Sequence, residues 1–278
     1  MIQLVALDLD GTLYAGPRLG VPESAWAAIE RGKGHGLRFA VCTGRPQGGY
    51  GLEWARRMEP QGAHVFNDGA SICDARGRPL HYEALPNLEQ IVALARKHRI
   101  TFDVLTETGG RYYEARLIPP GLEEHVAMVG VLARPALMER FFAPHGGAGE
   151  TVVRSWWVAA DPTDWEVAKP DLEAVPEIDI AEYLSPREAI VGIIRKGVSK
   201  ATGLAWLARH YGLDLSEIAM IGESDNDVTA LRQAGLGIAM GNAVEPVKAV
   251  AHHIVGHVRE GGFAQAIEHI LEYSHAAR

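Results

Sequence analysis

The sequence has little of several features that would point to particular classes of protein. Only two cysteines occur in 278 residues, Cys42 and Cys73, too few for a disulfide framework in a chain of this size. The apolar runs are far shorter than the roughly 20 residues that a membrane-spanning helix needs. Basic residues number 27 against 35 acidic ones, so the formal net charge is −8 and a polyanion would be repelled on average. These deficits predict a protein that binds neither nucleic acid nor a membrane.

The start of the chain, Met1-Ile2-Gln3-Leu4, also lacks the charged residues and the cleavage site of an export signal, so we expect a cytoplasmic protein. Apolar residues make up 47% of the chain and charged ones 22%, a balance that allows a sizeable core and excludes general disorder. At about 150 residues a domain, the length predicts two domains or one domain with a large insertion.

Strands and helices are predicted to alternate at both ends of the chain. The N-terminal series consists of strand 2–7, helix 22–31, strand 37–42, a helix that runs to residue 58, and strand 64–67. The C-terminal series starts near residue 189 and comprises helix 200–211, strand 218–221, helix 225–234, strand 236–240 and helix 246–251, and residues 262–273 follow it. Such alternation is typical of a parallel sheet with crossover helices.

A different pattern occupies residues 83–186. Asn87 followed by Gln90 predicts a capped helix start, and Thr108-Gly109-Gly110 predicts a hairpin between strands 101–105 and 111–115. Further elements are expected at 122–132 and 135–143, both helical, and at 151–160, a strand. The simplest organisation is an α/β core domain formed by residues 1–82 and 187–278, interrupted by an inserted α+β domain at 83–186.

The first predicted strand ends in two acids, Asp8 and Asp10. Residues two apart at the end of a strand point to the same side, and two close carboxylates need a cation or hydrogen bonds to offset their repulsion. Ligands of open parallel sheets bind beyond the carboxyl ends of the strands, so this pair indicates a divalent-metal and nucleophile site. The alternative is a solvated turn.

The second strand ends in Thr43-Gly44-Arg45-Pro46. A hydroxyl, a glycine that lets backbone amides come close and a guanidinium are all suited to phosphate oxygens. Proline favours the first turn of a helix, so a helix N-terminus is also expected to face an anion here. The alternative is an ordinary strand-to-helix turn.

A third polar cluster, Gly222-Glu223-Ser224-Asp225-Asn226-Asp227, follows another predicted strand. It offers hard oxygen ligands without cysteine or histidine, which suits Mg²⁺, although acids also favour a helix N-terminus for dipole reasons. Lys200 begins the first helix after the insertion and would neutralise carboxylates or hold a phosphate, unless it is a solvated surface lysine. Three strand ends and one helix start are therefore expected to converge on one edge of a sheet.

At these positions the sequence resembles the haloacid dehalogenase (HAD) superfamily of phosphohydrolases, and more narrowly its Cof-type branch with a type 2 cap. The matching segments are Asp8-Leu9-Asp10-Gly11-Thr12-Leu13, Thr43-Gly44-Arg45-Pro46, Gly197-Val198-Ser199-Lys200, Gly222-Glu223-Ser224-Asp225-Asn226-Asp227 and Ala239-Met240-Gly241-Asn242-Ala243. The resemblance covers nearly the whole chain and implies a Rossmann-like parallel sheet core (HAD-like) with an inserted α+β cap domain.

The resemblance also implies a Mg²⁺-dependent phosphatase of a small phosphorylated metabolite, such as a sugar phosphate, nucleotide or phosphorylated cofactor. Asp8 would attack phosphorus and Asp10 would act as general acid and base, while Thr43 and Lys200 would hold the transferring oxygens. The implied phosphate or substrate contacts are Gly11, Gly44, Arg45 and Asn226. The implied metal ligands are Asp8, Asp10 through its backbone carbonyl, Glu223 and Asp227.

Two residues depart from the family pattern. Glu223 stands where the family has aspartate, which leaves open whether Glu223, Asp225 or Asp227 completes the metal site. Asp68 stands where the family tends to have asparagine, and we interpret this as a minor change to a turn.

Two alternatives to a phosphatase are a phosphotransferase or mutase, and a sensor that binds a phosphorylated ligand without turnover.

Overall fold

Five parallel strands form the central sheet of the core, in the order β14-β13-β12-β1-β2. The computed structural model describes residues 1–113, 136–137 and 149–276. The strands of this sheet are β1 (Leu4–Leu7), β2 (Arg38–Val41), β12 (Ile218–Gly222), β13 (Leu236–Ala239) and β14 (His253–Ile254). All four residues of β1 are buried, as expected for a strand covered by helices on both faces.

Helices cover both faces of this sheet. Helices α1 (Glu23–Gly34), α2 (Gly49–Met58) and α10 (Gly262–Ala276) supply apolar side chains to one side of the core. The other side is covered by α7 (Lys200–Tyr211), α8 (Val228–Gln233) and α9 (Glu245–Lys248). The doubly covered parallel sheet confirms the predicted Rossmann-like architecture.

A small antiparallel sheet extends the core toward the inserted part. It consists of β3 (Ala63–Phe66), β4 (Ser71–Asp74) and β5 (Pro79–Tyr82), and a single bridge between Cys42 and Val65 joins it to the edge of β2. The turn between β3 and β4 contains Asp68 in the left-handed region, with φ +54°. The sequence pattern predicted β3 but neither β4 nor β5.

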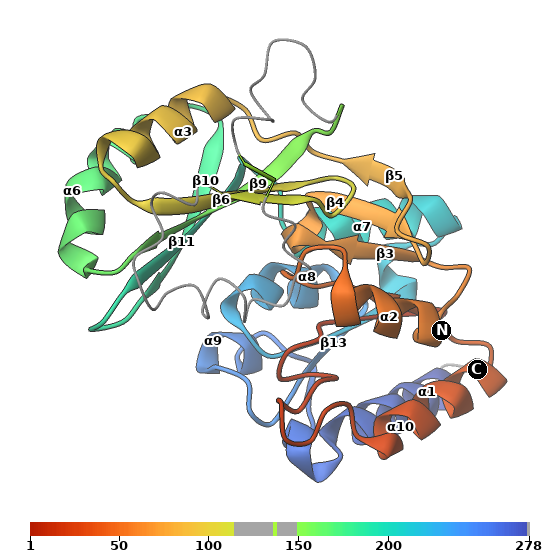
Figure 1. The fold of residues 1–278 in the computed structure, drawn as a ribbon. Helices are drawn as coiled ribbons and strands as arrows, with labels where there is room; N and C mark the ends of the chain where they lie inside the picture. Colours follow the sequence, from red (N-terminus) through yellow and green to blue (C-terminus); the bar gives the residue numbers. More distant parts are fainter. Residues whose placement is uncertain (114–135, 138–148, 277–278) are drawn as a thin grey trace.

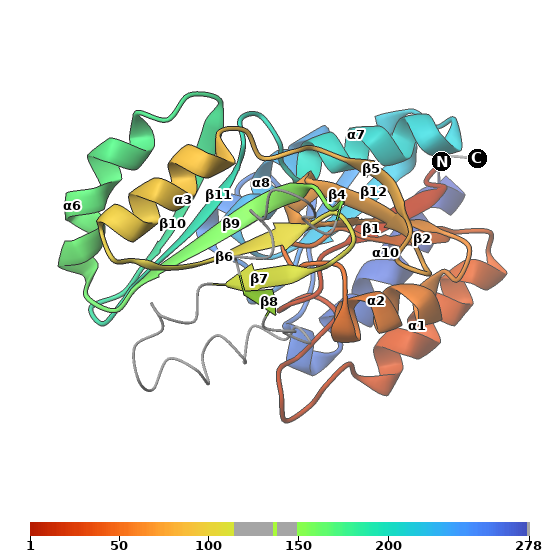
Figure 2. The same cartoon turned by 45° about the horizontal axis from the view of Figure 1, so that its top comes forward.

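The inserted part, here called the cap, is built on a six-stranded sheet in the order β10-β11-β9-β6-β7-β8. Its strands are β6 (Thr101–Thr106), β7 (Arg111–Tyr113), β8 (Ala136–Leu137), β9 (Val152–Ala159), β10 (Ile178–Leu184) and β11 (Ala189–Arg195). Helices α3 (Leu88–Lys97) and α6 (Pro162–Glu173) lie on the face that is turned away from the core (Figures 1 and 2).

The cap agrees with the sequence in its hairpin, in strand β9 and in the helix after Asn87, and it differs in other details. Strands β6 and β7 pair antiparallel, and β9 lies where strand 151–160 was predicted. The helix after Asn87 is present, but the expected side-chain cap is wrong, because the Asn87 amide donates to the carbonyl of Pro176 instead. Predicted helix 122–132 lies outside the described residues; within 135–143 only residues 136–137 are described, and they form β8.

The predicted return to the core at residue 187 falls between two strands of one sheet. β11 pairs along its whole length with β10 and also with β9, so it completes the cap sheet rather than starting the core. We therefore propose a domain boundary after Arg195. The apolar run 189–194 is typical of a buried strand, and nothing in that pattern tells which sheet the strand joins.

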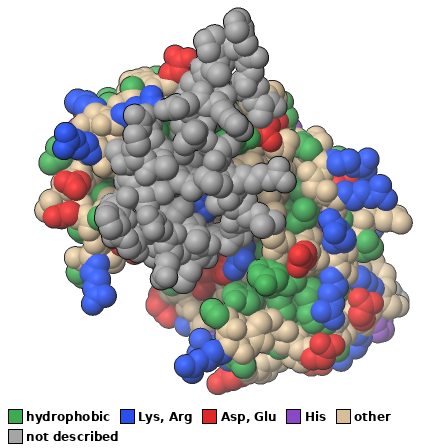
Figure 3. Space-filling model, in the orientation of Figure 1, with side chains coloured by type: hydrophobic (Ala, Val, Ile, Leu, Met, Phe, Trp, Pro, Cys, Tyr) green, Lys and Arg blue, Asp and Glu red, His purple; other side chains and the backbone are tan. Residues whose placement is uncertain are grey.

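In the part of the chain that the structure describes, none of the helices is both long and apolar enough to span a membrane. On the face drawn in Figure 3, acidic and basic side chains are intermixed over the described surface of the core.

Candidate active site

The carboxyl ends of β1, β2 and β12 bring the predicted residues to one edge of the core sheet. β1 pairs with β12 on one side and with β2 on the other, so the loops that follow all three strands are neighbours. The Asp8 amide continues this ladder by donating to the carbonyl of Ile221 at 3.0 Å. The convergence that the sequence predicted is therefore present in the fold.

At the centre of this edge, a buried ammonium group bridges two carboxylates. The Lys200 Nζ atom lies 2.8 Å from Asp8 Oδ1 and 2.7 Å from Asp227 Oδ1. Lys200 is the first residue of α7, whose N-terminus is fixed by a capping box between Ser199 and Thr202. Its side chain is only 1% exposed, so it is not the solvated surface lysine of the alternative interpretation.

Burial and the neighbouring charges shift the protonation equilibria of this group. Burial raises the pKa of Asp8 to about 7; Lys200 opposes the rise and Asp227 adds to it. Burial alone would lower the pKa of Lys200, but Asp227 and Asp8 outweigh it and hold that pKa well above its usual value. The lysine therefore stays charged, and the ionisation of Asp8 depends on positive charge nearby.

Glu223 joins Asp8 and Asp227 in a group of three carboxylates, with one oxygen from each lying within 4.8 Å of the others. Asp225 is exposed and is not part of this group. The second oxygen of Asp227 accepts from the backbone N–H groups of Glu223 and Ser224, at 2.9 and 3.1 Å, which fixes its orientation. Oxygen donors in this number suit a hard divalent cation.

Gly11 lies against the Glu223 carboxylate. A Cβ atom at Gly11 would come within 2.9 Å of Glu223 Cδ, and Gly11 has a positive φ of +72°, so two separate reasons favour glycine here. Its carbonyl accepts from the Asn242 amide at 2.8 Å, which ties the first motif to the last.

The Asp10 side chain does not join the three carboxylates. It is 52% exposed and forms a two-point ion pair with Arg45, in which both N–O distances are 2.6 Å. The Arg45 guanidinium also lies over the rings of Tyr14 and Trp54, 5.4 and 5.5 Å from their centroids. Although β1 ends at Leu7, the Asp10 carboxylate still lies near enough to Asp8 and Glu223 for its charge to contribute to the raised pKa of both.

Thr43 and Gly44 lie beside these charges. Thr43 is buried and its hydroxyl accepts from the Arg45 amide at 3.3 Å. The expectation that a helix starts at Pro46 is wrong, because α2 starts at Gly49. A Cβ atom at Gly44 would lie 2.9 Å from Asp68 Oδ1, so glycine leaves room for that carboxylate.

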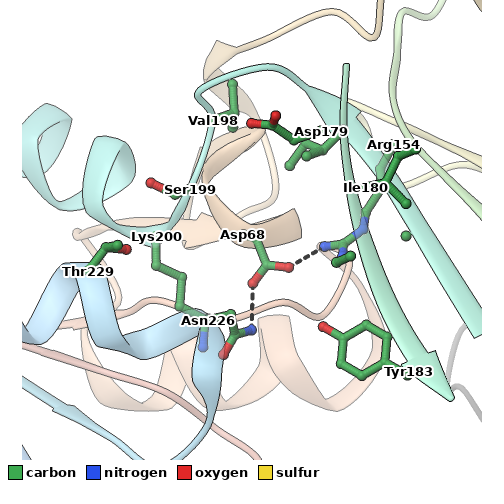
Figure 4. Close-up of a pocket in the computed structure, with 13 residues that line it drawn as sticks. Asp68, Arg154, Asp179, Ile180, Tyr183, Val198, Ser199, Lys200, Asn226 and Thr229 are labelled. Carbon is green, nitrogen blue, oxygen red and sulfur yellow. Dashed lines mark hydrogen bonds and ion pairs between the residues drawn. The ribbon is translucent and has the colours of Figure 1, made fainter. Parts of the chain in front are cut away.

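Asp68, which the sequence analysis treated as a minor change to a turn, is a link between the core and the cap. Its Oδ2 atom accepts from Nη1 of Arg154 on cap strand β9, and its Oδ1 atom accepts from the Asn226 amide at 2.9 Å (Figure 4). Burial would raise the pKa of Asp68, but Arg154 and Lys200 outweigh it and hold the pKa below its usual value. An arginine inside the apolar run of β9 was the sequence signal that could have revealed this pair.

Trp156 and Trp157 lie on opposite faces of β9, as their adjacent positions predict. Trp157 is fully buried in the cap core, whereas the Trp156 ring packs against Arg154, whose Cζ atom lies 4.0 Å from the ring centroid.

Cys42 is buried, and burial raises the pKa of its thiol, which agrees with the expectation that it is not a nucleophile.

A cavity of about 180 Å³ lies between the core and the cap beside these residues (Figure 4). Lys200, Asn226 and Asp68 line it from the core, and Arg154 and Tyr183 line it from the cap. Because Lys200 also contacts Asp8, a molecule in this cavity would lie next to the carboxylates of the site.

Comparison with known proteins agrees with the fold and the motifs. The family model described as haloacid dehalogenase-like hydrolase matches residues 5–267. A solved structure titled as a HAD subclass IIB sugar phosphatase has a TM-score of 0.76 at 23% identity, over 96% of this chain and 98% of the other. At that identity the similarity concerns the fold alone.

Two curated relatives are similar over nearly their whole length. A 5-amino-6-(5-phospho-D-ribitylamino)uracil phosphatase of Bacillus subtilis (strain 168) is 28% identical, over 95% of this chain and 96% of its own. A phosphatase of the same name from Escherichia coli (strain K12) is 27% identical, over 98% and 97%. With the family model spanning nearly the whole sequence, the chain belongs to the haloacid dehalogenase-like hydrolases.

Proposed function

We propose that this protein is a Mg²⁺-dependent phosphatase that hydrolyses a small phosphorylated metabolite through a phosphorylated Asp8. The observation that carries the proposal is the buried Lys200 ammonium, which contacts Asp8 and Asp227 while Glu223 completes a group of three carboxylates. Phosphoryl transfer needs mainly positioning and charge neutralisation, and this arrangement provides both.

The carboxylates fit a magnesium ion. Asp8, Glu223 and Asp227 would hold it, together with Asp10 through its backbone carbonyl, and their oxygen atoms are the ligands that Mg²⁺ prefers. When bound, Mg²⁺ would supply positive charge beside the carboxylates and the phosphate.

In the first step, an Asp8 carboxylate oxygen forms a bond to phosphorus as the bond from phosphorus to the substrate oxygen breaks. Asp10 gives its proton to that leaving oxygen, for which its carboxyl group must turn away from Arg45. Lys200 and Thr43 hold the phosphoryl oxygens, and the loops at Gly11 and Gly44, with Arg45 and Asn226, complete the binding site.

In the second step, Asp10 takes a proton from water, whose oxygen bonds to phosphorus as the bond to Asp8 breaks. Inorganic phosphate leaves and both carboxylates return to their starting states. The cap cavity next to Lys200 would receive the rest of the substrate. We further propose that the protein is cytoplasmic, which cell fractionation would check.

The test is phosphate release from a panel of compounds by protein stripped with EDTA, measured before and after Mg²⁺ is added. The panel contains sugar and polyol phosphates, nucleotides and phosphorylated cofactors. It also contains 5-amino-6-(5-phospho-D-ribitylamino)uracil, because two relatives are named for it. We expect release that depends on Mg²⁺ from at least one compound.

Two outcomes would contradict the proposal. Folded protein that releases no phosphate from any compound but is stabilised by one of them would point to a sensor. Transfer to an added alcohol that exceeds hydrolysis would point to a phosphotransferase or mutase.

A further inference from the structure

Arg154 brings a buried positive charge to the cap side of the cavity. It is 2% exposed and lines the cavity from β9, with its guanidinium 4.0 Å from the centre of the Trp156 ring. Gly192 on the adjacent strand makes room for both, since a Cβ atom there would come within 2.9 Å of each side chain. A guanidinium held in this way would bind a carboxylate or phosphate group well.

Asp68 already occupies that position. It accepts from Arg154 and from Asn226 through different oxygens, so both of its carboxylate oxygens are used (Figure 4). Its φ of +54° is a conformation that aspartate and asparagine tolerate better than most residues, and Gly44 leaves space for its side chain. Burial of both partners makes the pair nearly independent of solvent screening.

The other charges around the cavity are also balanced or negative. Lys200 is shared between Asp8 and Asp227, and Asp179 adds a carboxylate to the cavity wall. Among the lining residues that the structure describes, both cationic side chains are bonded to carboxylates.

We propose that Asp68 selects the substrate by neutralising Arg154, so that the cavity favours a leaving group with uncharged hydroxyl groups over one with a second anionic group. This inference rests on the proposed phosphatase function, because it concerns the part of the substrate that leaves Asp8.

The physical reason is the cost of an uncompensated charge in a buried place. An anionic leaving group would have to displace Asp68 from Arg154 or bring another negative charge beside Asp68. Hydroxyl groups avoid both costs, because they donate to carboxylates and accept from amides such as that of Asn226.

The test uses two compounds of nearly equal shape, D-glucitol 6-phosphate and 6-phospho-D-gluconate, which differ only in a hydroxymethyl or a carboxylate at the far end. The ratio of their kcat/KM values is measured for the wild type and for Asp68→Asn, which keeps the size and backbone preference of the residue. We expect the wild type to favour the polyol, and Asp68→Asn to shift the ratio toward the acid by about tenfold or more, because Arg154 is released.

Two further variants separate this effect from a general change of charge or structure. Asp68→Asn combined with Arg154→Met should lose the shift, because the freed cation is gone. Asp179→Asn removes one negative charge from the same cavity but leaves the Asp68–Arg154 pair intact, so its shift should stay below about twofold.

The same compounds are titrated calorimetrically into proteins that also carry Asp8→Asn, so that the preference is measured without turnover. An unchanged ratio in Asp68→Asn, an equal shift in Asp179→Asn, or binding of neither compound to any variant would overturn the inference. If the phosphatase proposal fails instead, no compound is hydrolysed, while the calorimetric preference still shifts with Asp68.

Discussion

Two groups of charged side chains lie beside the cavity, and they differ in the ratio of positive to negative charges. At the sheet edge, one ammonium, Lys200, faces three carboxylates, Asp8, Asp227 and Glu223. Between core and cap, one guanidinium faces one carboxylate. The pKa shifts follow this difference: burial raises the pKa of Asp8 and that of Glu223, whereas Arg154 helps to lower the pKa of Asp68 despite its burial.

This comparison teaches what each group requires. The excess of negative charge at the sheet edge requires a further cation, and a site for metal-assisted phosphoryl transfer has the same requirement. A balanced pair needs no ligand, so it joins the two domains and limits which charges can enter between them. Four experiments break or sharpen the comparison.

The largest effect is expected from Asp8→Asn. It removes the nucleophile with almost no change in volume, so phosphate release should fall by about 10³-fold or more while the melting temperature is kept or rises. Asp225→Asn is the matched control, because Asp225 belongs to the same acidic segment as Asp227 but is exposed and outside the three carboxylates. Equal loss of activity in both variants would contradict the assignment.

Breaking the balanced pair comes next. Arg154→Met leaves Asp68 buried without its cation and should lower the free energy of unfolding by about 3 kcal/mol in urea denaturation. Adding Asp68→Asn to this variant should restore part of the loss. Lys97→Met is the control: the Lys97–Asp171 pair has side chains 61% and 40% exposed, so solvent screens it and its loss should have a much smaller effect on stability. If Lys97→Met and Arg154→Met lower the free energy of unfolding by similar amounts, the buried Asp68–Arg154 pair contributes no more than an exposed pair.

A buried base without a counter-ion gives a third test. Burial lowers the pKa of His64 from 6.5 to about 4, while its ring accepts from the Val41 amide at 3.2 Å. Between these pH values the unfolded chain binds a proton that the folded chain does not, so stability falls as the pH falls from about 6.5 to 4. His64→Asn keeps an acceptor but does not titrate.

The free energy of unfolding of the wild type, measured relative to His64→Asn, should therefore decrease by about 2 kcal/mol between pH 7 and pH 5. A difference that stays constant with pH would show that the folded ring takes up a proton as easily as the unfolded one.

The smallest effect concerns the metal-binding residue that the sequence could not identify, because Glu223, Asp225 and Asp227 were all candidates. Glu223→Gln removes one negative charge from the three carboxylates and should raise the Mg²⁺ concentration that gives half-maximal activity by about tenfold, or about 1.4 kcal/mol. Asp225→Asn should leave that concentration within about twofold. The opposite result would place Asp225, not Glu223, at the cation.

The site at the sheet edge was predictable from sequence because its signals are local. Buried strands followed closely by Asp8, Thr43 and Glu223 are recognisable one at a time. Parallel pairing then brings the ends of these strands together. The same reasoning predicted the doubly covered sheet and the position of Lys200 at the start of its helix.

Only the tertiary structure decided which distant residues meet. Asp68 and Arg154 are 86 positions apart and pair because the cap lies over the core, a contact with no local signal. The cap sheet likewise includes β11, because a buried apolar strand fits either sheet, and Asp10 pairs with Arg45 from another loop. Short-range patterns specify strands and their ends, whereas pairing across domains depends on the packing of the whole chain.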